Sequence, residues 1–253
     1  MKCLRELKRC AVLLAFGLVI GLSATMAQTT TPRVPDNDDI LRRTIDADSP
    51  YHIDRLLTKY LTGDENLTSE EYHYLYYGYA YSDNYRPLEP IPAEDRVLMV
   101  MEEIMKEPTE ERMLRLVDAG LEVMERDPFS PKNLNLLAFA YGSLGDSINE
   151  RKCYDRLEGV LKTIENSGTG AKEGSPMHVL MFSHAADVLY ARGLEIKNRE
   201  IVSRTCEYIF LTMKDKNGSL GYYFDFSRVY WVRSEESELS QKRGWMINDM
   251  PLK

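Results

Sequence analysis

A single stretch, residues 70–87 (EEYHYLYYGYAYSDNYRP), contains seven tyrosines: Tyr72, Tyr74, Tyr76, Tyr77, Tyr79, Tyr81 and Tyr85. Their spacing begins as the alternation of a strand, but Tyr77 breaks it and the later tyrosines are out of phase. Thr68 and Glu71 before and within the stretch have the spacing of a capping box, which starts a helix. Pro87 and the turn-forming residues before it end the stretch. We therefore predict a helix that uses tyrosine where other helices use leucine.

Such a helix has two aromatic faces. One stripe, at positions i, i+3, i+4 and i+7, consists of Tyr74, Tyr77, Gly78 and Tyr81. The second stripe, on the opposite side, consists of Tyr72, Tyr76 and Tyr79. Gly78 is a poor helix former, and its missing side chain lets a neighbouring helix come close. Two interpretations of the second stripe remain open: it packs in the core of a central helix, or it forms a surface that binds a ligand.

The segment PKNLNLLAFAYGSLGD, which begins at Pro131, repeats the spacing of the first stripe with Leu134, Leu137, Ala138 and Tyr141. This pattern resembles the first helix of a tetratricopeptide repeat. The spacing between the equivalent positions Tyr74 and Leu134 is neither one repeat of about 34 residues nor a multiple of it, so the array is irregular. A helix before it is predicted to end at Asp127 and Pro128. The helix after it, DSINERKCYDRLEGVLKTIEN, is predicted to face inward with Tyr154 and Leu157.

The pattern changes near residue 167, where NSGTGAKEGSP is rich in glycine. HAADVLYARG is predicted to be a short helix ended by Gly193, and REIVSRTCEYIFLTMKD is a β-branched and aromatic stretch. Asn217-Gly218 predicts a two-residue type I′ hairpin turn, with LGYYFDFSRVYW as the return strand. The predicted fold class is α+β: irregular tetratricopeptide-like helical hairpins, then a small C-terminal α+β module with a β-hairpin.

The N-terminus has the three parts of a secretory signal peptide: a basic start, an apolar run from Ala11 to Leu22, and small residues at Thr25 and Ala27. We predict cleavage before Gln28 and a periplasmic or secreted protein; an uncleaved anchor remains the alternative. The apolar run is shorter than the about 20 residues of a transmembrane helix, and no transmembrane segment is expected after cleavage.

Four regions are therefore predicted: a signal peptide (1–27), a helical-repeat-like region (28–166), an α+β module (167–232) and a loose C-terminal tail (233–253). The net charge of −8 becomes more negative once the basic leader is removed, which argues against nucleic acid and anionic lipid as partners. Cys153 and Cys206 remain in the exported chain as one disulfide or as two buried thiols.

Several segments resemble, in this order, the exported bacterial family catalogued as domain of unknown function 4919: EEYHYLYYGYAY with YRP, then SGTG, HVL, HAADVL, EYIFL and GYYFDFSRVY. The resemblance covers nearly all of the chain after residue 27. Because the family has no known activity or catalytic residues, the resemblance implies no chemistry.

The residues themselves give no catalytic motif. The glycine loop around Gly170 lacks phosphate-binding spacing, and His178 and His184 are more simply explained as surface or capping residues than as metal ligands. No catalytic residue, cofactor or metal is predicted. Triads assemble only in the folded chain, so the question of an enzyme stays open.

By the tetratricopeptide resemblance, a binding groove is predicted at Tyr72, Tyr79, Ser82, Asp83, Lys132, Asn135 and Phe139. Tyrosine suits recognition because it combines a large area with a hydroxyl group and loses little rotamer entropy. We predict an exported, non-catalytic protein of the cell envelope that binds a protein or peptide. The alternative is a carbohydrate-binding or carbohydrate-hydrolysing protein; a purely structural envelope protein is a third interpretation.

Overall fold

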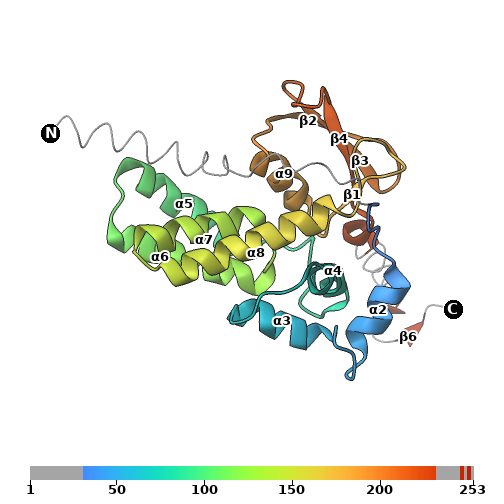
Figure 1. The fold of residues 1–253 in the computed structure, drawn as a ribbon, viewed down its shortest axis with the longest axis horizontal. Helices are drawn as coiled ribbons and strands as arrows, with labels where there is room; N and C mark the ends of the chain where they lie inside the picture. Colours follow the sequence, from blue (N-terminus) through green and yellow to red (C-terminus); the bar gives the residue numbers. More distant parts are fainter. Residues whose placement is uncertain (1–30, 232–245, 248–249, 252–253) are drawn as a thin grey trace.

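The computed structural model of the chain describes residues 31–231 and two short strands at 246–247 and 250–251 (Figure 1). The predicted signal peptide and most of the predicted C-terminal tail lie outside the described residues. No helix within the described residues is long and apolar enough to cross a membrane.

The described chain consists of helices followed by a small sheet. In chain order the helices are α2 (Asn37–Ile45), α3 (Ile53–Thr62), α4 (Ser69–Gly78), α5 (Pro92–Lys106), α6 (Glu110–Arg126), α7 (Pro131–Ser143), α8 (Ser147–Glu165) and α9 (Phe182–Ala191). The strands are β1 (Met177–His178), β2 (Ile196–Ile201), β3 (Cys206–Leu211) and β4 (Gly221–Asp225), in the order β1-β4-β3-β2. β1 pairs with β4 in parallel and the other pairs are antiparallel. Strands β5 (Met246–Ile247) and β6 (Met250–Pro251) pair with each other. The α+β class is confirmed.

Helices α5 to α8 pack side by side in chain order, as the predicted hairpins require (Figure 1). Helix α6 ends at Arg126 with Asp127 as its C-cap, as predicted. On α8, Leu157 is buried as predicted, but Tyr154 is 40% exposed, so its predicted inward position is wrong. The buried face of α8 starts at Cys153, and Tyr154 is rotated away from that face by one residue step. The tetratricopeptide likeness itself stays a prediction.

The tyrosine stretch forms α4, and the predicted capping box of Thr68 and Glu71 is present. Its last turn tightens into a 3₁₀ turn, η1 (Tyr79–Tyr81), which the sequence did not indicate. Helix α4 is surrounded by α2, α3 and α8, and every residue from 72 to 78 is buried. The second stripe therefore lies in the core. A Cβ on Gly78 would lie 2.5 Å from Cγ2 of Thr44 on α2, which confirms that this glycine permits close helix packing.

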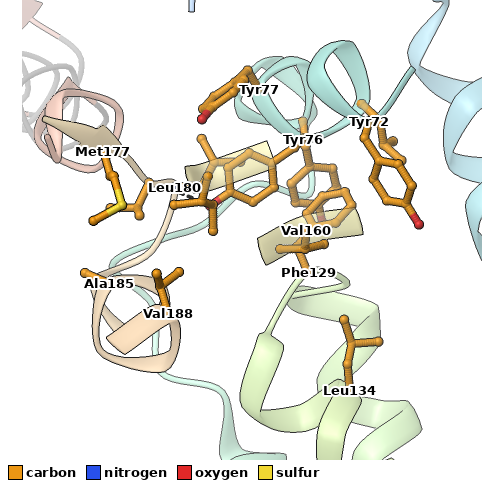
Figure 2. Close-up of a cluster of buried hydrophobic side chains, with 14 of the residues drawn as sticks. Tyr72, Tyr76, Tyr77, Phe129, Leu134, Val160, Met177, Leu180, Ala185 and Val188 are labelled. Carbon is orange, nitrogen blue, oxygen red and sulfur yellow. Dashed lines mark hydrogen bonds between the residues drawn. The ribbon is translucent and has the colours of Figure 1, made fainter. Parts of the chain in front are cut away.

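Around α4 the core is continuous between the helices and the sheet. Figure 2 shows part of it, with side chains from α4, α7, α8 and α9 converging on one another. The same cluster includes Leu134 of α7 and Phe224 of β4. Cys153 and Cys206 are both buried and are not bonded to each other.

The C-terminal part differs from the prediction in three places. The stretch REIVSRTCEYIFLTMKD contributes two strands, β2 and β3, separated by a turn at residues 202–205. The β3–β4 connection is longer than a two-residue turn, because the carboxylate of Asp215 accepts the backbone N–H groups of Asn217 and Ser219 at 2.9 and 2.7 Å. The return strand ends at Asp225, and residues 227–231 are helical. Asp225 accepts the N–H of Ser227, which favours a helix start there.

Candidate functional site

The predicted groove residues have different surroundings in the fold. Tyr72 and Tyr79 are 8% and 3% exposed, and their hydroxyl groups donate to backbone carbonyls of α8 and α6. Ser82 lies at the end of η1, where its hydroxyl accepts the N–H of Asn84, and Asp83 is exposed.

The three predicted residues of α7 lie in other surroundings. Lys132 is exposed, and its backbone N–H donates to Asp187 of α9 at 3.2 Å. Asn135 is half-buried, and Phe139 packs against the apolar cluster between α5 and α6. The structure thus does not gather the predicted residues into one groove, and their role in binding stays a prediction.

A buried polar network is the first alternative site. Nε2 of His184 lies 3.0 Å from Oδ2 of Asp127, and Nδ1 lies 2.8 Å from the hydroxyl of Tyr76. The Tyr76 hydroxyl also accepts the N–H of Leu180. Burial alone would lower the pKa of His184, but the charge and hydrogen bond of Asp127 raise it above the ordinary value.

The types of residue in this network resemble a catalytic relay, but no substrate can reach it. Tyr76 and His184 are fully buried, and Asp127 is 3% exposed. The network instead joins α4, the α6–α7 connection and α9. His178 and His184 have different carboxylate partners, since Nδ1 of His178 lies 3.4 Å from Asp225. Within the described residues no group of three or more His, Cys, Asp or Glu side chains is placed to hold a metal ion.

The second candidate is a cavity of about 420 Å³ between α4 and α8, which we call the α4–α8 cavity. Its lining residues are Thr31, Arg33, Asn66, Leu67, Ser69, Tyr72, His73, Asp155, Glu158, Gly159, Lys162, Thr163 and Asn166. Its volume lies within the range of about 300–1,000 Å³ that is typical of small-ligand sites. Of the predicted groove residues, only Tyr72 lines it.

The charged residues of the α4–α8 cavity already have partners of opposite charge. Lys162 pairs with Glu158 on α8. The guanidinium of Arg33 lies 3.5 Å from Glu70, and Asp155 lies 3.8 Å from Arg151. The lining of the cavity therefore carries paired charges and has no excess of positive or negative charge.

His73 and Thr163 are the two most buried polar residues of this cavity. The hydroxyl of Thr163 donates to a backbone carbonyl of α8, whereas His73 differs. His73 is 7% exposed, and within the described part of the chain no hydrogen bond to its ring is present. Its ring contacts the rings of Tyr74 and Tyr77, which hold it in place. Burial and then the charge of Arg33 lower the pKa of His73 to about 4, so the ring is neutral at pH 7.

The sequence did not identify His73 as a functional residue. The only local signal is a histidine between two aromatic stripes, and the other lining residues come from distant segments, α8 and residues 31–33. Ser69 and His73, one turn apart on α4, both line the cavity, but no hydrogen bond between them is present. They do not form an activated nucleophile in this structure.

The fold and the cavity describe an α+β protein with a central tyrosine helix and a small polar site beside it. The chain matches the family described as Domain of unknown function (DUF4919) over residues 38–234. It belongs to this family, which confirms the resemblance found in the sequence. Neither the curated proteins nor the solved structures give a match.

Proposed function

We propose that this protein is a non-catalytic binding protein of the cell envelope that takes a short peptide segment into the α4–α8 cavity. The observation that carries the proposal is a cavity whose charges are already paired, beside a neutral and buried His73 without a partner. A peptide backbone offers alternating neutral donors and acceptors, which suits such a lining. The location in the envelope rests on the predicted signal peptide.

Two further contacts favour a peptide over a sugar. The backbone N–H of Arg33 donates to the carbonyl of Asn166 at 2.7 Å, so a chain segment without regular structure already hydrogen-bonds at this edge of the cavity. The ring of Tyr72 lies against Gly159, where an added Cβ would come within 2.1 Å of the ring. Because that ring is packed against helix α8, it is poorly placed to stack on a sugar.

The test is selection of a displayed random peptide library on the mature chain, residues 28–253. Asn66→Trp would fill the cavity from an exposed loop position, and Glu65→Trp is the matched control, because the neighbouring Glu65 is exposed and does not line the cavity. We expect selected peptides to bind the wild type and Glu65→Trp equally and to bind Asn66→Trp at least about 10-fold more weakly, a loss of about 1.4 kcal/mol.

Two results would overturn the proposal. Either the selection yields no peptide whose binding is weakened by Asn66→Trp, or the selected peptides bind all three proteins equally. A glycan array on the same three proteins tests the carbohydrate alternative. Glycans that bind the wild type and Glu65→Trp but not Asn66→Trp, in the absence of such peptides, would replace the peptide with a carbohydrate.

A further inference from the structure

We propose that the α4–α8 cavity selects an uncharged polar segment, and that His73 determines this specificity by hydrogen-bonding, as a neutral imidazole, to an amide group of the ligand. The inference rests on the proposed function and specifies the chemistry of its ligand. It is carried by three features of the site: the paired charges of the lining, the unpartnered and buried ring, and the uncharged groups around it.

The paired charges disfavour a charged ligand. A carboxylate entering the cavity would meet Glu158 and Asp155 as well as Lys162, and an ammonium group would meet Lys162 and Arg33. Either ion would therefore meet a group of its own charge as well as one of opposite charge, so the lining favours neither sign. A neutral ligand meets no like charge and leaves these ion pairs in place.

The position of His73 explains why the ligand is recognised through this residue. The ring has no hydrogen-bond partner among the described residues and it lines the cavity, so its nitrogens are available to a ligand. A neutral imidazole has one N–H donor and one acceptor nitrogen. A peptide amide also has one donor and one acceptor, so it can bond either nitrogen. A ligand carboxylate would be bound best by an imidazolium, which burial and Arg33 disfavour here.

Groups beside His73 extend the same chemistry. Asn66, Ser69 and Asn166 line the cavity and carry no charge. Among the hydrogen bonds of the described residues, none involves the side chain of these three. They are therefore available to a ligand, and amides and hydroxyls bond equally well to further amides.

The experiment uses one selected peptide whose binding depends on the cavity, meaning that Asn66→Trp weakens it. Its affinity is measured by titration calorimetry for the wild type, His73→Gln and His73→Leu. Glutamine keeps one group with both a donor and an acceptor, whereas leucine keeps bulk without either. We expect His73→Leu to weaken binding about 10-fold or more and His73→Gln to stay within about 3-fold, because the net value of a hydrogen bond sets this scale.

The matched control is His52→Leu, since His52 precedes α3, makes no capping hydrogen bond and does not line the cavity. It should leave affinity unchanged. If His73→Leu does not fold, the ring nitrogen signals of His73 in the wild type are followed by nuclear magnetic resonance during peptide addition. They should shift and should remain those of a neutral ring.

The two proposals fail in different ways. A selection with no cavity-dependent peptide overturns the proposed function and this inference together. Cavity-dependent peptides that tolerate His73→Leu, or that share a charged residue whose neutral substitution abolishes binding, overturn only the inference. The same holds if the His73 ring becomes protonated when the peptide binds at neutral pH.

Discussion

Asp127→Asn tests the buried network between α4, the α6–α7 connection and α9. The carboxylate of Asp127 lies 3.0 Å from His184 and also accepts the N–H of Phe129 at 3.2 Å. Asparagine has nearly the same shape and can still accept from Phe129, but it removes the charge. His184 can then become neutral, so no unpaired charge remains in the core. The expected cost is that of a poorly satisfied buried hydrogen bond, about 1–3 kcal/mol of unfolding free energy. Asp127→Ala also abolishes the Phe129 bond and should cost more, about 3–5 kcal/mol.

The pH dependence gives the sharper test. Because the pKa of His184 is raised in the folded state, its pairing with Asp127 stabilises the fold below the unfolded pKa of about 6.5. This contribution is lost as the pH rises through the folded pKa of His184. The loss caused by Asp127→Asn should therefore be largest near about pH 6 and smaller at about pH 9.

Urea unfolding followed by circular dichroism at both pH values measures this difference. Tyr76→Phe is the control, because it removes the hydroxyl that hydrogen-bonds to His184 and to the N–H of Leu180 but leaves the charge of Asp127 in place. Its cost should be similar at both pH values. An Asp127→Asn cost that is equal at about pH 6 and about pH 9, or that is below about 0.5 kcal/mol, would refute the assignment of a stabilising ion pair.

Substitutions at three further positions, Gly78, His73 and Tyr79, test the surroundings of these residues. Gly78→Ala should lower the urea midpoint, because overpacking against Thr44 costs about 1–3 kcal/mol and helix propensity returns about 1 kcal/mol; a higher midpoint would contradict the close packing of α2. The pKa of His73 is lowered to about 4, so the fold should lose stability as the pH falls from about 6.5 towards 4, and His73→Gln should remove that loss. Parallel pH profiles for the wild type and His73→Gln would show that His73 titrates normally. Tyr79→Ala should cost about 3–5 kcal/mol and Tyr79→Phe about 1 kcal/mol in thermal unfolding. Near-native stability of Tyr79→Ala would instead place Tyr79 on the surface.

The sequence predicted those features of the fold that depend on neighbouring residues. The capping box at Thr68, the end of α6 and the small residue at Gly78 are encoded within a few positions of one another. The hairpin loop and the helix after β4 were predicted wrongly, because single carboxylates, Asp215 and Asp225, redirect the backbone there. Their effect depends on side-chain hydrogen bonds, which hydrophobic periodicity does not report.

The candidate site was less predictable than the fold. Tyr76 and His184 meet although they are 108 positions apart in the sequence, and the α4–α8 cavity combines residues 31–33 with α8. The groove inferred from repeat spacing assumed that Tyr72 and Tyr79 face outward. That spacing describes a helix with one covered face, whereas every residue of α4 from 72 to 78 is buried.

The burial of the tyrosine stretch also explains its composition, since residues 72–80 and Tyr85 are all buried. The segments packed around it present backbone carbonyls, and a leucine at these positions would leave them without a donor. The hydroxyl of Tyr77 donates to the carbonyl of His178, and that of Tyr85 donates to the carbonyl of Leu180. Tyr79 donates to Arg126 in the same way. Each ring thus fills core volume and its hydroxyl pairs a carbonyl of another element. Because two of these carbonyls lie in and beside β1, the tyrosine stretch, which runs from α4 through η1 to Tyr85, serves as the common core of the helices and the sheet. His73, on α4, has no such partner within the described residues, which is why we place ligand recognition there.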